Sequence, residues 1–269
     1  MITKEQLQYY TFAPLDRFKS DIIHCFTTRN TGVSSGLYKS LNLGLHVGDN
    51  LKNVIDNRHK TVAVLNLSLH QGIALKQIHG NHVVVVNESA LGRGMFSYND
   101  SYCEADGMVT STAGILLTTY YADCVPIYIY NPKVKAIGLA HAGWKGSVLK
   151  IASKLVECLS ENFNSKPSDC VVVIGPSIGP CCYEVEELVI EAVKDIFDVS
   201  DDFIELREKG KTNLNLWEIN KRLLQESGVS NQNIYISKLC TSCMEKYFYS
   251  HRRDGAQTGR MSAILSIRG

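Results

Sequence analysis

Seven short apolar runs, rich in β-branched residues, are the feature that most restricts how this chain folds. Runs of that length and composition are typical of β-strands with at least one buried face. They lie at 83–87, 115–121, 125–130, 134–140, 171–175, 234–239 and 262–267. Segments with helical periodicity lie between them and before them, at 51–65, 148–163, 184–197 and 215–227. This alternation predicts a mixed α/β or α+β fold.

Residues that favour helix ends flank three of the predicted helices. Asp49 precedes the first helix, Ser147 is the expected N-cap of the second, and Gly228 ends the fourth. No internal repeat and no long Pro/Ser-rich linker interrupts the 269 residues, which are enough to bury a substantial core. We therefore expect a single catalytic domain over 1–269.

The charge balance argues against two classes of partner. Lysine and arginine number 28 against 27 acidic residues, a formal net charge of +1, so there is no electrostatic case for binding nucleic acid or an anionic membrane. The start, MITKEQLQYYTF, has neither the apolar segment of a signal peptide nor a basic amphipathic pattern. No apolar run is long enough to span a bilayer. We expect a cytoplasmic protein.

Cys124 and His141 flank a predicted β-hairpin. Its turn, Asn-Pro-Lys-Val, has Asn at the first position and Pro at the second, as type I turns prefer. If the turn is centred between Pro132 and Lys133, Cys124 lies directly opposite His141, and opposed Cβ atoms are about 4.5–5.5 Å apart. That spacing suits two ligands of one metal ion, and it also suits a thiol hydrogen-bonded to an imidazole. A bulge at Pro126 would disturb this register.

The segment after His141, Ala-Gly-Trp-Lys-Gly, leads into the predicted helix at Ser147. A glycine-containing turn before a helix exposes backbone N–H groups to an anion, and Lys145 adds a positive charge. An ordinary tight turn with a solvated lysine explains the same residues, so both interpretations stay open.

Among the other histidines, His79 has the position that most suggests a functional role. It lies just before a predicted strand, as Cys124 does. No partner can be identified for four further histidines, which we interpret as ordinary buried or surface side chains: His24, His46, His59 and His70.

The nine cysteines include two close pairs. Cys240 and Cys243 form a Cys-x-x-Cys motif after a predicted strand, but the sequence has no second Cys-x-x-Cys motif to complete a structural zinc site. Adjacent Cys181 and Cys182 precede a predicted helix, and one of them is expected near the active site. We interpret the Cys-x-x-Cys thiols as reduced and non-catalytic.

Several unusual strings resemble, in order, those of the YfiH family, also called the laccase-domain, polyphenol-oxidase or peptidoglycan editing factor family. The strings are KQIHG (76–80), EADGMVTS (104–111), ADCVPIYIYNP (122–132), GLAHAGWKGS (138–147), IGPSIGPCCYEV (174–185), SHRRDG (250–255) and TGR (258–260). The resemblance implies an α+β fold, a layered α/β/β/α arrangement with central mixed β-sheets similar to that of cytotoxic-necrotizing-factor deamidases.

The resemblance also implies a metal site. The family's ligands match His79, Cys124 and His141, which implies a His2Cys site for one Zn²⁺ per chain, with copper binding only adventitiously. Three protein ligands leave a position for water or substrate, which is the catalytic arrangement. Cys124 and His141 are thereby expected to act in catalysis too.

The implied chemistry is phosphorolysis of the purine nucleosides adenosine, inosine, guanosine and methylthioadenosine, together with adenosine deamination. Purine nucleoside and phosphate are then the expected small-molecule partners. Asp106 is the preferred general base or partner of a ligand histidine, ahead of Asp123, which should face away from Cys124 in a regular strand. Five residues are candidates for binding substrate: Arg29, Asn42, Lys145, Arg252 and Arg253.

Three other functions compete with this one. The same zinc site suits an amidase that edits peptidoglycan precursors such as UDP-muramoyl-serine. A metal-free hydrolase would use Cys124 as nucleophile and His141 as base. A non-enzymatic protein would use zinc only to hold its fold together. Multicopper oxidase chemistry is disfavoured, since the eight histidines form no His-x-His pair.

Overall fold

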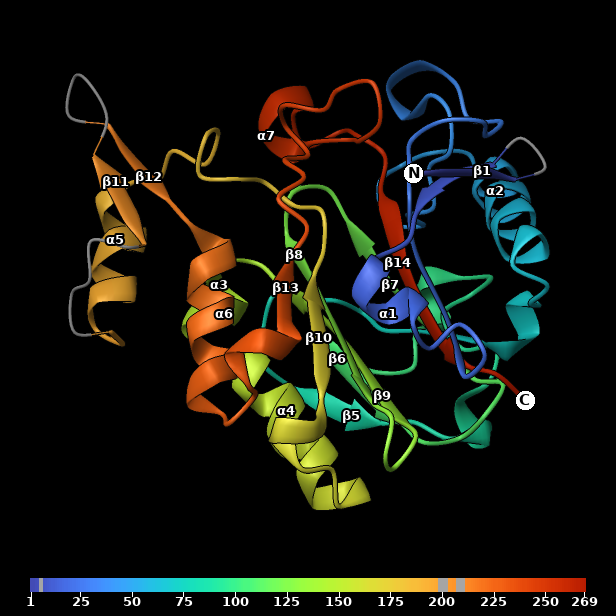
Figure 1. The fold of residues 1–269 in the computed structure, drawn as a ribbon. Helices are drawn as coiled ribbons and strands as arrows, with labels where there is room; N and C mark the ends of the chain where they lie inside the picture. The colour runs from blue at the N-terminus through green and yellow to red at the C-terminus, as the bar shows by residue number, and fades with distance from the viewer. Residues whose placement is uncertain (5–6, 198–202, 207–210) are drawn as a thin grey trace.

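The computed structural model describes residues 1–269 except 5–6, 198–202 and 207–210. Two six-stranded mixed sheets pack against each other, and helices cover their outer faces (Figure 1). This is the layered α/β/β/α arrangement of the α+β class, so the expected fold class is confirmed.

The first sheet contains both ends of the chain. Its strand order is β1 (Ile2–Lys4), β2 (Leu7–Tyr10), β3 (Ile22–Thr27), β14 (Met261–Ile267), β7 (Leu116–Tyr121) and β4 (Gly72–Ala74). All neighbours are antiparallel except β4 and β7, which are parallel. The C-terminal strand β14 therefore lies in the middle of the sheet. Because it is antiparallel to β7, the residues just before β14 lie at the same end of the strands as the β7–β8 turn.

The second sheet holds the predicted hairpin at its centre. Its order is β13 (Ile234–Ile236), β10 (Val171–Ile174), β8 (Val125–Asn131), β9 (Ala136–Ala142), β6 (Gly107–Thr110) and β5 (Val83–Val85). The two outer pairs, β10 with β13 and β5 with β6, are parallel. A separate small hairpin is formed by β11 (Ile204–Leu206) and β12 (Thr212–Leu214).

Helices cover the two sheets from opposite sides (Figure 1). Helix α2 (Leu51–Val64) lies on the first sheet, whereas α3 (Trp144–Val148), α4 (Ile151–Phe163) and α6 (Leu216–Glu226) lie on the second. Three further α-helices lie in the described part, besides several short 3-10 helices: α1 (Ala13–Asp16), α5 (Glu187–Lys194) and α7 (His251–Asp254).

The layers explain why the central strands read as uninterrupted apolar runs. Every residue of β8 and β9 is buried, because one face packs on α4 and the other on the first sheet. The layer between the sheets is rich in aromatic rings, including Phe26, Tyr121 and Tyr128, each of which contributes about 1.5–3 kcal/mol by burial. The Tyr128 hydroxyl donates to the Cys25 carbonyl, 2.8 Å away, so its polar end is satisfied.

The predicted hairpin forms, but its predicted register is wrong. His141 faces Pro126, and not Cys124, because the turn contains four residues and Lys135 adopts a left-handed conformation with φ 50°. Cys124 lies two residues before the position opposite His141, just outside β8. A shift of two residues preserves the face of the sheet, so the two side chains still lie on the same side.

Helix α2 begins at Leu51, as predicted, whereas the predicted helix start at Ser147 is wrong. The N-cap of α2 is Asn50 and not Asp49, and the Asn50 side chain accepts from the Lys52 N–H. Ser147 caps no helix, because the chain already turns helical at Trp144; its buried hydroxyl instead accepts from Asn220 on α6, 2.9 Å away. Within the described residues, no helix is long and apolar enough to cross a membrane.

Candidate active site

A cavity of about 470 Å³ lies at the ends of the central strands, within the range usual for small-molecule sites. Both sheets and three helices contribute to its wall. Among its lining residues are His79, Cys124, His141, Trp144, Tyr183 and Arg260.

Three potential metal ligands converge in this cavity from separate parts of the chain. His79 comes from the loop between β4 and β5, Cys124 from the β7–β8 turn, and His141 from the end of β9. Their ligand atoms all lie within 4.8 Å of one another. His141 is almost fully buried, Cys124 is partly exposed and His79 is exposed, so the cluster opens to solvent on the His79 side.

Gly143 allows the chain to pass close to this cluster. A Cβ atom at this position would lie 3.1 Å from both the Cys124 Sγ and the His79 Cδ2. Glycine therefore lets α3 begin beside the three ligands without displacing them.

Asp106 forms hydrogen bonds with both His79 and His141. Its carboxylate, which is fully buried, accepts from the His141 Nδ1 at 2.8 Å and from the backbone N–H groups of Ile78, His79 and Gly80 at 2.7–3.2 Å. These bonds support His79 in a left-handed conformation with φ 63°. Because the Nδ1 of His141 is bonded to Asp106, its Nε2 is the ring nitrogen that remains available to a metal ion.

The electrostatics favour a thiolate beside a protonated imidazole in the metal-free protein. Burial opposes ionisation of Cys124, but the positive charge of His141 and hydrogen bonds from both histidines lower the pKa of the thiol to about 6. Burial likewise opposes protonation of His141, yet Cys124 and Asp106 raise the pKa of its imidazole to about 9. Burial also disfavours the Asp106 carboxylate, but its bonds to His141 and the backbone lower its pKa overall.

The donor set fits a zinc ion. Two imidazole nitrogens and one thiolate are common zinc ligands, and the carboxylate behind His141 is the usual partner of a zinc-bound histidine. No fourth His, Cys, Asp or Glu joins the cluster among the residues that the structure describes. A zinc ion held by these three residues would keep one coordination position open, as catalytic zinc sites do.

Two guanidinium groups face the same cavity. Arg252, on α7, donates to the Glu184 carbonyl at 2.7 Å and stacks on Tyr183, with 5.2 Å from the guanidinium carbon to the ring centre. Arg260, immediately before β14, is oriented by the carbonyls of Thr258 and Gly259. Together they give the cavity a cationic side for an anion.

The other four predicted substrate-binding residues are not among the residues that line the cavity. Arg29 donates to the Lys39 and Glu245 carbonyls and stacks on Tyr249. Asn42 is buried and bonds Gly44, Asp49 and Arg260. Lys145 is exposed beside Trp144, and Arg253 bonds Asp254 and the carbonyls of Thr241, Ser242 and Phe248.

Asp123 lies before β8 with φ 87° and also lines the cavity, so the expectation drawn from a regular strand does not apply to it. Its carboxylate accepts from the hydroxyls of Thr241 and Ser250 and from the Arg252 N–H. It therefore connects the Cys124 turn to the first residues of α7, which carries Arg252.

Sequence reasoning missed several residues of the cavity wall. Arg260 lies in the TGR string, which was recognised without singling out its arginine. His46 was interpreted as an ordinary side chain, yet it lines the cavity; burial, and then the charge of Arg260, lower its pKa to about 4. Tyr183 and His251 also line the cavity, and their neighbours in recognised strings were the available signal.

Comparisons with known proteins agree with this arrangement. The family model described as multi-copper polyphenol oxidoreductase laccase matches residues 23–268. The Bacillus subtilis (strain 168) protein named purine nucleoside phosphorylase YlmD is 36% identical over 268 residues, which cover 100% of this chain and 96% of that protein. Its namesake from Geobacillus stearothermophilus is 40% identical over 244 residues, covering 90% of this chain and 89% of that protein.

Among solved structures, the crystal structure of the Bacillus licheniformis hypothetical protein YfiH is similar throughout. It has a TM-score of 0.92 and 36% sequence identity, and the match covers 97% of this chain and 99% of that one. The likeness therefore extends over both sheets and all the elements that form the cavity.

Proposed function

The chain belongs to the family described as multi-copper polyphenol oxidoreductase laccase, which is the YfiH family, and on that premise we propose that it is a zinc-dependent purine nucleoside phosphorylase with adenosine deaminase activity. The observation that carries the proposal is the convergence of His79, Cys124 and His141, with ligand atoms within 4.8 Å, in a cavity that Arg252 and Arg260 also line. The names of the two similar proteins support the substrate class.

Phosphorolysis requires an anion site beside the sugar. A phosphate oxygen forms a bond to the ribose carbon, the bond from that carbon to the purine nitrogen breaks, and the departing purine takes a proton. Arg252 and Arg260 are suited to hold the phosphate, because a guanidinium binds an oxyanion through two parallel hydrogen bonds. His251, in the same wall, is the proposed proton donor to the purine.

Aromatic and neutral polar groups suit the base. The Tyr183 and Trp144 rings line the cavity and offer flat surfaces against which a purine can stack. His46 is neutral at pH 7, since its pKa is about 4, and its imidazole can both donate to and accept from the base edge.

His79, Cys124 and His141 are the residues that would hold zinc. When bound, the ion supplies Lewis acidity and lowers the pKa of a coordinated water to about 7, which is the chemistry that deamination of adenosine needs. Asp106 keeps the His141 ring in the tautomer that presents Nε2, and it fixes the His79 backbone through hydrogen bonds. We assign Asp106 this positioning role in preference to that of a general base.

Two further expectations extend the proposal. Residues 1–269 act as one catalytic domain, which is supported by the contribution of both sheets to the cavity wall. The protein works in the cytoplasm, which is supported by nine cysteines that are all free thiols.

A metal-free Cys–His hydrolase is the second candidate, favoured by the lowered pKa of Cys124 beside His141.

Two experiments on one preparation separate the candidates: metal analysis, and turnover of adenosine with and without phosphate. Zinc with phosphate-dependent release of adenine supports the phosphorylase, and phosphate-independent formation of inosine supports the deaminase. Turnover by zinc-free protein supports the dyad. Release of serine from UDP-muramoyl-serine, without nucleoside turnover, supports the amidase and overturns the proposal.

A further inference from the structure

The second pair of cysteines that the Cys-x-x-Cys motif lacked in the sequence is supplied by the fold. Cys181 and Cys182 lie in the loop after β10, and Cys240 and Cys243 lie in the turn after β13. Strands β10 and β13 are parallel neighbours, so the two segments that follow them start at the same end of the strands. A bridge between Ser177 and Cys240 continues the pairing beyond the strands.

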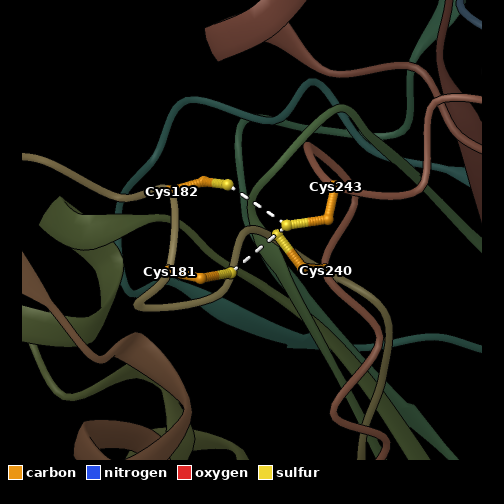
Figure 2. A group of neighbouring side chains, drawn as sticks. All are labelled: Cys181, Cys182, Cys240 and Cys243. Atoms are coloured by element: carbon orange, nitrogen blue, oxygen red, sulfur yellow. Dashed lines mark hydrogen bonds between the residues drawn. The ribbon is translucent and has the colours of Figure 1, made fainter.

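The four sulfur atoms converge from these two loops (Figure 2). The Sγ of Cys243 lies 3.4 Å from that of Cys181 and 3.3 Å from that of Cys182, and all four Sγ atoms lie within 4.8 Å of one another. Four thiolates about 2.3 Å from one tetrahedral zinc ion would be separated by about 3.8 Å. Sulfur atoms in a disulfide are about 2.05 Å apart. The spacing therefore matches a single ion.

The surroundings of the cluster also suit a metal site. Cys240 is buried and its Sγ accepts from the Gly179 N–H at 3.3 Å, which is a typical second contact of a ligand thiolate. Cys181 and Cys243 are exposed, so an ion can enter from solvent. The only other group of three or more potential ligands in the described residues is the active-site cluster, which shares no residue with this one.

We infer that Cys181, Cys182, Cys240 and Cys243 bind a second zinc ion in a closed, four-thiolate structural site. Four protein ligands leave no position for substrate, in contrast to the open site at Cys124. Four-thiolate sites select thiophilic ions such as zinc over hard cations such as Mg²⁺.

The site would support the wall of the active-site cavity. The Cys181–Cys182 loop continues into Tyr183, and the carbonyls of Cys182 and Glu184 accept from Arg252. On the other side, Thr241 bonds Asp123, next to Cys124. A zinc ion between the two loops would therefore brace the segments that position Tyr183 and Arg252, whatever reaction the cavity performs.

Zinc counting tests the inference. Wild type, Cys243→Ser, Cys181→Ser/Cys243→Ser and the matched control Cys158→Ser, a partly buried thiol on α4 outside the cluster, are purified with zinc and dialysed anaerobically. Each cluster variant should carry one zinc fewer per chain than wild type, and the control should carry the same number. Because the readout is a difference of one ion, it does not depend on whether the His79–Cys124–His141 site is filled.

Cobalt(II) substitution provides a readout of ligand type. Wild type should show intense thiolate-to-cobalt charge-transfer absorption that Cys243→Ser largely loses and Cys158→Ser retains, with all three proteins folded by circular dichroism. Equal zinc content in wild type and both cluster variants would overturn the inference. So would intact-mass detection of a disulfide among these four cysteines in protein kept free of oxygen, because it would make them a redox pair.

Discussion

The Asp106 carboxylate receives the Nδ1 hydrogen of His141 at 2.8 Å and, with the same oxygen, the backbone hydrogen of His79 at 3.0 Å. One buried side chain therefore fixes two potential metal ligands that are 62 residues apart in the sequence. The cost of burying the carboxylate is offset by the three backbone N–H groups and the imidazole that surround it.

Asp106→Asn should weaken zinc binding about 10–100-fold, which is typical when the carboxylate behind a ligand histidine is lost. Asparagine offers only one acceptor oxygen to the four donors, so the free energy of unfolding should also fall by about 1–3 kcal/mol. Competition with a chromogenic chelator measures the zinc affinity. Asp100→Asn, which removes an exposed carboxylate paired with Arg93, is the control. Equal affinities in the two variants would contradict the positioning role.

Arg252→Lys and Arg253→Lys should separate substrate binding from stability. Arg252 lines the cavity, so its replacement should raise the KM for phosphate several-fold and change the melting temperature little. Arg253 bonds three carbonyls and Asp254, so its replacement should lower the melting temperature with a smaller effect on that KM. Phosphate titration and thermal melts measure both, and the reverse pattern would refute the assignment of Arg252.

Removal of zinc by a chelator should abolish nucleoside turnover and leave the β-sheet circular dichroism spectrum in place. The fold should persist because the cluster lies at the ends of strands whose core is apolar. Added zinc should restore activity. Iodoacetamide should prevent this recovery when it is applied to the zinc-free protein and have little effect on the zinc-loaded protein, as expected for a metal ligand at Cys124. Full activity after chelation would instead mean a metal-free dyad.

Acid should destabilise the protein through His24. Burial lowers the pKa of His24 to about 4, with Asp16 offsetting only part of this effect, and its Nε2 accepts from the Phe12 N–H. Between the ordinary pKa of 6.5 and about 4, the unfolded chain binds a proton that the folded chain does not. The unfolding free energy should therefore fall as the pH drops through this window, by about 2–3 kcal/mol from this residue.

His24→Gln keeps an acceptor near the Nε2 position without a titrating group, so it should flatten the decline in stability between pH 6.5 and pH 4. His70→Gln, at an exposed position, should leave the decline as in wild type. Urea unfolding at several pH values measures the slopes. Identical slopes for wild type and His24→Gln would contradict the prediction, because they would mean that folding does not lower the pKa of His24.

The seven apolar runs predicted seven real strands, because buried strands leave the clearest pattern in a sequence. Strands β3, β4 and β6 went unrecognised, because glycine starts β4 and β6 and His24 and Cys25 interrupt β3, whereas the equally short β5 and β13 lie in runs rich in β-branched residues. The hairpin register was missed because it depends on the left-handed conformation of Lys135, which its residue type does not reveal. The shift by an even number of residues left Cys124 and His141 on one face.

The cavity was predictable only where a recognised string contained a chemically distinctive residue. His79, Cys124 and His141 were named on that basis, and the structure brings them together. Arg260 and the four-cysteine cluster were not foreseen, since each depends on strands that pair across long stretches of sequence: β14 enters the middle of the first sheet, and β13 joins β10. Such pairing cannot be read from one segment alone.

The most direct test compares adenosine turnover, with and without phosphate, in zinc-loaded wild type, Cys124→Ala and the control Cys158→Ala. We expect phosphate-dependent adenine release by wild type and the control, and a loss of at least about 100-fold in Cys124→Ala, equivalent to about 2.7 kcal/mol of transition-state stabilisation. Equal turnover by wild type and Cys124→Ala would show that the chemistry does not take place at the His79–Cys124–His141 site.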